Sequence, residues 1–175
     1  IFDEKLKTLN IFGTGLMYDY LVNKTFWKSI VQLTEIVNIS NGVTNIGTFA
    51  FYDCENLKNV YISNTVQIID YASFNGCISL SSINIPDSVY KINNCFIFCR
   101  KLRSVTIGKG LEKIEFGPFA YCDNIVSFNV SIYNQKYQTI DGIIFSKDKK
   151  TLVAYPSGKN ISSYSIPSYV TSINK

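Results

Sequence analysis

The chain has 175 residues, enough for one compact domain or one run of stacked repeats, and its 46% hydrophobic content supplies a continuous core and argues against disorder. The net charge of +4 is small and the basic residues are scattered, whereas nucleic-acid binding requires a clustered basic face, so no nucleic-acid partner is expected. Histidine is absent, which removes the commonest general base and a common metal ligand, and neither a metal nor another cofactor is expected.

The start of the chain does not resemble a signal peptide. No stretch approaches the roughly 18 consecutive apolar residues that a membrane-spanning helix needs, so we expect no membrane insertion within this chain. Because the chain begins abruptly at Ile1 rather than at a methionine, we expect a fragment of a longer protein.

Regularly spaced cysteines show that the chain is built from repeats. Cys54, Cys77, Cys99 and Cys122 are separated by 23, 22 and 23 residues. Each cysteine follows a phenylalanine by three positions, at Phe51, Phe74, Phe96 and Phe119. Two columns in the same register establish a period of about 23 residues, which is typical of a stacked repeat architecture.

Each period predicts three short elements. The block at 50–54 is short enough for one helical or 3₁₀ turn. The alternation Val60-Tyr61-Ile62 predicts a strand with one buried face, and the pair Val66 and Ile69 predicts a short second segment that is either extended or a turn. The same strand pattern, followed by the same apolar pair, recurs in further copies at 37–46, 80–92, 102–114 and 161–173.

One such unit cannot bury its own apolar face, whereas stacked copies share a core, with parallel strands about 4.8 Å apart. The sequence therefore predicts an elongated, mainly β solenoid with a parallel sheet along one side. We expect the cysteines to pack inside it as small hydrophobes, with disulfides between neighbouring units as the alternative. Cys95 lies four residues before Cys99, which leaves a metal site there as a further alternative.

Three segments carry a resemblance to a known family. They are LKNVYISNTVQIIDYASFNGC at 57–77, LRSVTIGKGLEKIEFGPFAYC at 102–122 and GVTNIGTFAFYDC at 42–54. They resemble the BspA-like leucine-rich repeats, also called the Treponema pallidum type, and the resemblance covers almost the whole chain. It implies a leucine-rich-repeat solenoid that coils in the right-handed sense, with short helical or 3₁₀ turns opposite the sheet.

The resemblance divides the chain into four parts of one solenoid domain. Residues 1–32, with Trp27, are similar to an N-terminal capping region, and residues 33–124 hold regular repeats of about 23 residues. Residues 125–156 are similar to a β-hairpin insertion, with strands expected near 143–146 and 151–155. Residues 157–175 are expected to form a partial final repeat.

On each predicted strand, the residue between two buried positions faces outward. That column gives the candidate ligand-binding face: Asn38, Tyr61, Asn84, Thr106, Asn129 and Ser165. An uncharged polar strip with one aromatic suits recognition of a protein or glycan, and Tyr61 is the first candidate because aromatic side chains are enriched at binding hot spots. The alternative for each of these residues is a merely solvated sheet.

The turn of the predicted hairpin offers a second candidate contact, formed by Lys147, Asp148, Lys149 and Lys150. Sequons of the form Asn-x-Ser/Thr make candidate N-glycosylation sites of Asn23, Asn38, Asn129 and Asn160. Two of these sites lie in the outward column, where glycans would obstruct the strand face and move binding to the edges or the hairpin.

The exposed sheet offers no converging acid, base or nucleophile, so the chain is not expected to be an enzyme. A cysteine nucleophile, with Cys95 as the least regular candidate, is the catalytic alternative. Members of the resembled family are typically surface-exposed and implicated in attachment. The resemblance thus implies an extracellular or cell-surface adhesion module whose partner is a host extracellular-matrix or cell-surface protein. The alternative is a structural spacer that projects another domain of a longer surface protein.

Overall fold

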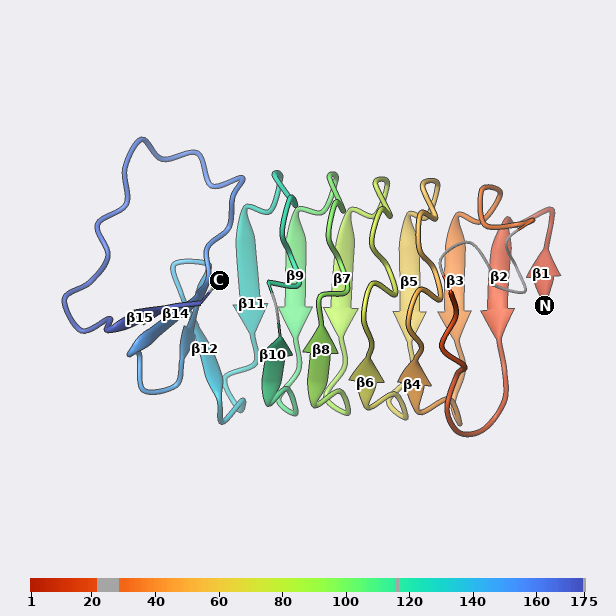
Figure 1. Cartoon of the computed structure of the whole chain (residues 1–175), viewed down its shortest axis with the longest axis horizontal. Coiled ribbons are helices and arrows are strands. Elements are labelled where there is room, and N and C mark those ends of the chain that lie inside the picture. Colours follow the sequence, from red (N-terminus) through yellow and green to blue (C-terminus); the bar gives the residue numbers. More distant parts are fainter. Residues whose placement is uncertain (22–28, 116, 175) are drawn as a thin grey trace.

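The computed structural model describes residues 1–21, 29–115 and 117–174, which form 15 strands, and all but the last four of them belong to a solenoid (Figure 1). Each period of the sequence makes one coil. The described residues contain no α-helix or 3₁₀-helix. Nor do they form any helix of the length and apolarity needed to cross a membrane.

The first strands of successive coils form one long face, called here the strand face (Figure 1). Its strands are β1 (Phe2–Asp3), β2 (Thr8–Ile11), β3 (Ile36–Ile39), β5 (Asn59–Ile62), β7 (Ser82–Ile85), β9 (Ser104–Ile107) and β11 (Ser127–Val130). β2, β3 and β5 pair in parallel, as do β7, β9 and β11, and β1 adds an antiparallel edge to β2. The predicted parallel sheet is therefore confirmed.

A proline lies where the strand face is divided. β5 and β7 are neighbours, but they belong to separate hydrogen-bonded groups (Figure 1). In the next coil, the residue after the strand, Gly108, donates its N–H to Ile85 of the coil before it. Pro86 holds the same position after β7 and has no N–H to donate to Ile62. The proline thus removes one of the bonds that would join the two groups.

The second extended segments form a parallel sheet on another side of the coils (Figure 1). Its strands are β4 (Asn45–Ile46), β6 (Ile68–Ile69), β8 (Lys91–Asn93) and β10 (Lys113–Glu115). They pair in coil order, with equivalent isoleucines in register. Only the second residue of each apolar pair lies in a strand, so of the two predicted alternatives, an extended segment or a turn, the isoleucine positions adopt the first.

The third segment of each coil was expected to be helical, and that expectation is not confirmed in the described residues. Tyr52 donates its N–H to Phe49 three residues back, but Phe51 donates to Ser73 of the next coil. A helix would direct every N–H back along its own chain. Because alternate N–H groups bond to the neighbouring coil instead, these turns form a third ladder along the solenoid.

This alternation requires left-handed backbone at two positions in each turn. The positions form two columns, Phe49, Ala72, Asn94 and Gly117, and Asp53, Gly76, Phe98 and Tyr121, with φ between 46° and 77°. A left-handed conformation costs a non-glycine residue about 1–2 kcal/mol. Most of these residues are not glycine, so stacking between coils overrides the local backbone preference.

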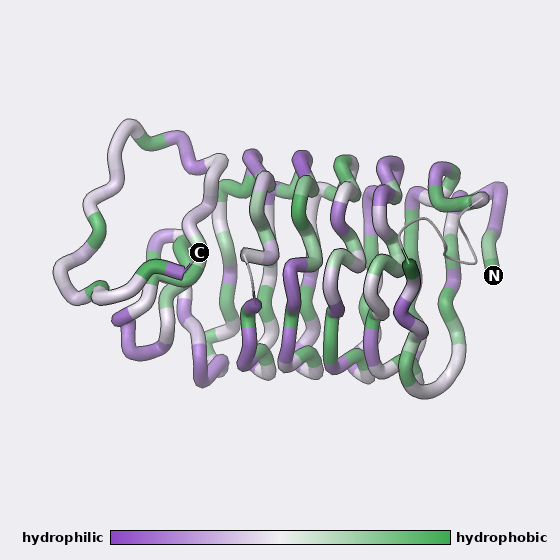
Figure 2. Tube along the Cα trace, viewed as in Figure 1, coloured by the Kyte–Doolittle hydropathy of each residue, from purple (hydrophilic) through white to green (hydrophobic). Residues whose placement is uncertain are grey.

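Aromatic rings run through the core along the solenoid. Phe51, Phe74, Phe96 and Phe119 stack with ring centroids 5.2, 5.5 and 5.7 Å apart. Cys77, Cys99 and Cys122 each donate an S–H to the backbone carbonyl of the phenylalanine one coil earlier. All five cysteines are buried and free, which confirms the predicted interior packing. Hydrophobic segments recur at matching positions from coil to coil (Figure 2).

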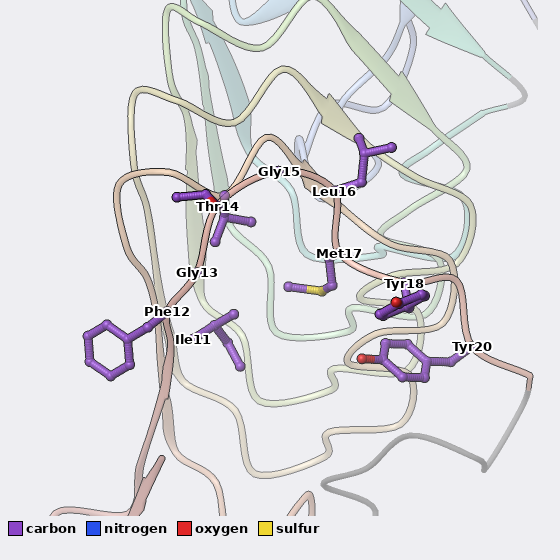
Figure 3. Close-up of a pocket in the computed structure, with 10 residues that line it drawn as sticks. Ile11, Phe12, Gly13, Thr14, Gly15, Leu16, Met17, Tyr18 and Tyr20 are labelled. Atoms are coloured by element: carbon purple, nitrogen blue, oxygen red, sulfur yellow. The ribbon is translucent and has the colours of Figure 1, made fainter.

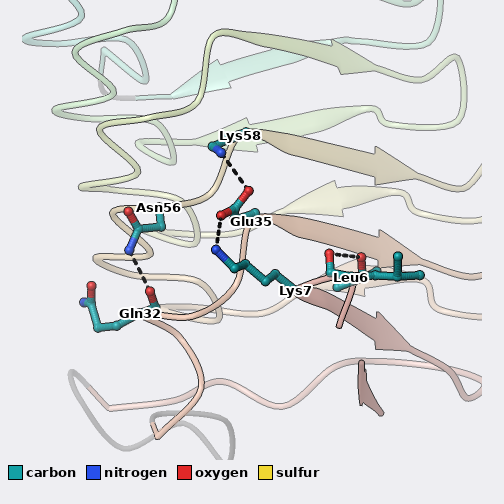
Figure 4. Close-up of polar contacts among 7 residues, drawn as sticks. Leu6, Lys7, Gln32, Glu35, Asn56 and Lys58 are labelled. Atoms are coloured by element: carbon teal, nitrogen blue, oxygen red, sulfur yellow. Dashed lines mark hydrogen bonds and ion pairs between the residues drawn. The ribbon is translucent and has the colours of Figure 1, made fainter. Parts of the chain in front are cut away.

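The N-terminal residues run beside the first coils. The side chain of Asn45 accepts a hydrogen bond from the N–H of Met17 and donates one to its carbonyl, which covers the edge of β4. Glu35 joins Lys7 and Lys58 through ion pairs of 2.7 Å each (Figure 4). Hydrogen bonds from these two ammonium groups lower the pKa of Glu35 from 4.5 to about 2. Trp27 lies outside the described residues.

The C-terminal strands form a separate four-stranded sheet at one end (Figure 1). They are β12 (Tyr137–Ile140), β13 (Ile143–Ser146), β14 (Thr151–Ala154) and β15 (Ser172–Ile173). β12, β13 and β14 pair antiparallel in sequence order, and β15 joins β14 in parallel. Strands are thus present at both places where the sequence predicted them, 143–146 and 151–155.

No strand forms around Ser165, so the expected last copy of the strand face is wrong. The edge of β11, on which that strand would stack, is already occupied. Phe128 donates its N–H to the carbonyl of Gly142, and Val130 donates to the hydroxyl of Thr139. Residues of β12 and of the turn that follows it therefore take the place of the predicted strand.

A buried amide fixes the passage from β11 to β12. Asn134 is fully buried, and its Nδ2 donates to the carbonyls of Gly108 and Leu111 at 3.0 Å each. Its Oδ1 accepts from the N–H groups of Lys136 and Tyr137. The side chain thus satisfies four backbone groups where the regular coils give way to the C-terminal sheet.

Ala72→Gly and Ala50→Gly separate backbone strain from packing, because both alanines are buried but only Ala72 has a positive φ, of 54°. Each substitution removes a buried methyl group, at a cost of about 0.8 kcal/mol. Only Ala72→Gly also relieves left-handed strain. We expect its free energy of unfolding in urea to exceed that of Ala50→Gly by about 1 kcal/mol. Equal stabilities would contradict the assignment of strain to this column.

Asn134→Ala leaves the carbonyls of Gly108 and Leu111 without their side-chain donor. We expect the free energy of unfolding to fall by about 2 kcal/mol or more. The exposed Asn129 provides the matched control, since Asn129→Ala should change the same quantity by less than about 0.5 kcal/mol. Urea denaturation measures both, and a small effect at Asn134 would show that water replaces the amide.

Candidate binding surface

The outward column of the strand face includes one residue more than the sequence indicated. Asn10 of β2 lies opposite Asn38, and Asn38 lies opposite Tyr61. Asn10 was missed because no cysteine marks the period so early in the chain. The alternation Thr8-Leu9-Asn10-Ile11, with Leu9 buried, is the signal that could have found it.

The side chains of this column differ in what they offer a partner. Asn38 is half-buried, and its Nδ2 donates to Oδ1 of Asn10 at 2.8 Å. Tyr61 leaves 61% of its surface exposed. Asn84, Thr106 and Asn129 are exposed and follow one another in register on β7, β9 and β11. The amides at the start of the column therefore form a hydrogen bond with each other, whereas the last three side chains face solvent.

These last three residues line one depression of about 330 Å³ near the carboxyl ends of their strands. The remaining wall consists of Asn64, Ile85, Pro86, Asp87, Ile107, Gly108 and Ser131. Asp87 is the charged residue of this wall, and its carboxylate accepts the backbone N–H of Lys109 at 2.8 Å. The rest of the depression presents amide, hydroxyl and backbone groups, which both donate and accept hydrogen bonds.

Glycines set the shape of this depression. A Cβ on Gly108 would lie 2.6 Å from the backbone nitrogen of Asp87, and one on Gly110 would lie 2.0 Å from its carbonyl oxygen. The turns that follow β7 and β9 thus approach so closely that no larger residue fits without a shift. The wall is formed largely by packed backbone, and its shape does not depend on mobile side chains.

The four hairpin residues share one turn between β13 and β14 and lie outside the depression. Asp148 organises the turn, because its Oδ1 accepts from the hydroxyl of Ser146 at 2.6 Å and from the N–H of Lys150 at 3.0 Å. These hydrogen bonds lower the pKa of Asp148 below its usual range. The lysines of this turn remain exposed.

The candidate glycosylation sites occupy different environments. Asn129 is exposed in the wall of the depression, so a glycan there would fill it. Asn38 is half-buried, and Asn160 is exposed on the irregular segment after β14. Asn23 lies outside the described residues. Modification of these sites stays a prediction.

A second depression, of about 190 Å³, lies in the N-terminal part (Figure 3). Residues 11–18, Tyr20 and Val43 line it. No carboxylate or amine side chain is among them, and the titratable groups of this lining are the phenols of Tyr18 and Tyr20. It is an apolar recess between the chain's first loop and the first coil.

Catalytic and metal-binding chemistry finds little support in the described part of the chain. It contains no group of three or more Cys, Asp or Glu residues that could hold a metal ion. Cys95, the candidate nucleophile, is fully buried, and this burial raises the pKa of its thiol. A nucleophilic cysteine needs an accessible thiolate. The environment of Cys95 opposes both accessibility and ionisation.

Thiol labelling checks this conclusion. Because all five cysteines are buried, we expect Ellman's reagent to react with the folded protein at least about tenfold more slowly than with the protein in denaturant. One thiol that reacts fast in the folded state would contradict the packing role. Mass spectrometry of the labelled peptides would then identify the residue.

Comparison with known proteins agrees with this architecture. Six copies of the BspA type leucine-rich repeat region match residues 20–152. Similar solved structures include a leucine-rich repeat protein from Eubacterium ventriosum (22% identity, TM-score 0.76), the pneumococcal vaccine antigen PcpA (18%, 0.63) and the T. pallidum leucine-rich repeat protein TpLRR (17%, 0.61). No match was found among curated proteins.

The similarity extends along the whole chain. It covers 98%, 99% and 96% of this chain, and 52%, 53% and 70% of the three similar proteins in the same order. The chain thus spans about half the length of the first two. Identities this low show a shared fold, whereas the six family matches also show the shared repeat. The chain belongs to the BspA-type leucine-rich repeat family.

Proposed function

We propose that this chain is a cell-surface binding module, which attaches to a host extracellular-matrix or cell-surface protein through its strand face. The depression lined by Asn84, Thr106 and Asn129 supports this function most directly. Its side chains converge from three neighbouring coils whose spacing is fixed by backbone pairing. A surface organised in this way loses little conformational freedom when it binds a partner.

The chemistry of the strand face favours an uncharged partner surface. Amide and hydroxyl side chains exchange hydrogen bonds with the backbone and polar side chains of a protein. The exposed ring of Tyr61 adds an aromatic contact of the kind enriched at binding hot spots. Because no charge dominates this face, we expect its affinity to depend little on salt concentration.

Location at the cell surface is part of this proposal. One similar structure is that of a pneumococcal vaccine antigen. A solenoid with an exposed, regular face fits the same setting, and we place this chain at the cell surface or outside the cell.

Thr106→Lys tests the strand face, because Thr106 is exposed at its centre and a lysine there introduces an unmatched charge. We expect affinity for immobilised laminin, fibronectin or collagen, measured by surface plasmon resonance, to fall at least about tenfold for the ligand that binds. Tyr61→Ala should also weaken binding. Gln67→Lys is the matched control, since Gln67 is exposed just before β6 of the other sheet.

Two results would contradict the proposed function. One is the absence of saturable binding to any of these ligands, which would favour a spacer that only projects another domain. The other is an equal loss of affinity in Thr106→Lys and Gln67→Lys, since that would show that binding does not depend on the strand face.

A further inference from the structure

A cluster of exposed cations lies along one edge of the solenoid, in the turns that precede the strands of the strand face. The turn before β9 carries Arg100, Lys101 and Arg103, all of them exposed. None of the ion pairs among the described residues includes any of the three. Their charges are therefore free to meet an anion from outside the chain.

An exposed aromatic stack lies beside these cations. The rings of Phe98 and Tyr121 are 4.7 Å apart at their centroids and inclined by 15°. Phe98 leaves 42% and Tyr121 63% of its surface exposed, so the stack is open to solvent. The guanidinium carbon of Arg100 lies 6.0 Å from the centre of the Phe98 ring. Charge and aromatic surface thus occur together on neighbouring coils.

The backbone at the two aromatic positions is left-handed. Phe98 and Tyr121 have φ of 61° and 57°, in the column where an earlier coil has Gly76. A bulky residue in this region is uncommon and costs free energy. Since these rings are largely exposed, core burial does not offset that cost. The same conformation recurs at Asp53 and Gly76 of the earlier coils, so the repeat imposes it, and what distinguishes these two coils is that large aromatic rings are exposed there.

Neighbouring coils hold the cationic turn in place. Lys101 donates its N–H to the carbonyl of Ile78, and Arg103 donates to that of Ser81, both in the preceding coil. From the following coil, Nδ2 of Asn124 donates to the carbonyl of Arg100 at 2.7 Å. The backbone that carries the three cations is thus bonded on both sides, which limits the ordering that binding requires.

We propose that Phe98, Arg100, Lys101, Arg103 and Tyr121 bind an anionic polysaccharide. Its carboxylate or sulfate groups match the planar donors of arginine and the ammonium of lysine. Its sugar rings present a flat C–H face that stacks on the exposed aromatic pair. An acidic peptide would satisfy the charges but has no comparable flat face for the rings. This site uses none of the residues of the strand face and does not rest on the function proposed for it.

A heparin decasaccharide is a suitable probe, with binding measured by isothermal titration calorimetry. We expect saturable binding that weakens steeply from about 0.05 to 0.5 M salt, because screening shortens the range of exposed charges. The triple variant Arg100→Ala, Lys101→Ala, Arg103→Ala should lose at least about tenfold in affinity. Tyr121→Ala should also weaken binding while leaving the net charge unchanged.

The hairpin turn supplies a matched control. Replacing Lys147, Lys149 and Lys150 by Ala removes the same charge from another exposed turn, and affinity should stay within about twofold of the original. Tyr61→Ala should likewise leave heparin binding unchanged. Circular dichroism and the thermal unfolding midpoint confirm that each variant is folded. These probes and variants differ from those of the strand-face test, so failure of one proposal is distinguishable from failure of the other.

Three outcomes would overturn the proposed polysaccharide site. The first is no binding of the decasaccharide at low salt. The second is an equal loss of affinity in the two triple variants, which would mean general attraction by net charge. The third is tighter binding of a poly-glutamate chain of matched charge, which would assign the cations to an acidic protein partner.

Discussion

Main-chain hydrogen bonds between successive coils are the constraint on which the rest of the structure depends. They run along the strand face, the second sheet and the turns. Because each bonding N–H must meet a carbonyl about one period away, in the preceding or the following coil, every coil has to follow nearly the same path. The phenylalanine stack and the buried cysteines occupy positions that this shared path creates. The left-handed residues of the turns are tolerated for the same reason, since local strain is small beside the bonds that a different path would lose.

The fold could be predicted from the sequence where burial depends on residue type at a fixed spacing. Alternating apolar residues identified the strand face, and the pair spaced by three located the second segment without deciding between a strand and a turn. The turns were different. Their apolar residues fit one helical turn as well as the observed ladder, and the choice depends on carbonyls such as that of Ser73, which belong to the next coil. A single repeat contains no information about how its N–H groups meet a neighbour, so the helical expectation failed there.

The candidate site shows the same division. Asn84, Thr106 and Asn129 could be placed together because strand alternation and the period together determine which residues share a face. The depression itself could not be predicted, because it depends on how closely the turns at Asp87 and Gly108 approach. Ser165 was placed wrongly because a competitor, the turn after β12, occupies the edge of β11. Asn10 was missed because the cysteine column, which set the register, does not reach the first coil.

Stacking also separates the surfaces that each coil presents. Within one coil, the strand and the turn face different sides of the solenoid. A strand residue such as Thr106 and a turn residue such as Arg100 can therefore change without altering a common contact. The core and the inter-coil bonds supply the stability, and the outward positions are left to recognition. That separation explains how one chain combines a nearly uncharged strand face with a cationic, aromatic turn edge. It also explains why strain is retained at Phe98. The hydrogen bonds to neighbouring coils hold the backbone in this conformation whatever the side chain. The strain at one ring is small beside the stabilisation that the stacked coils provide.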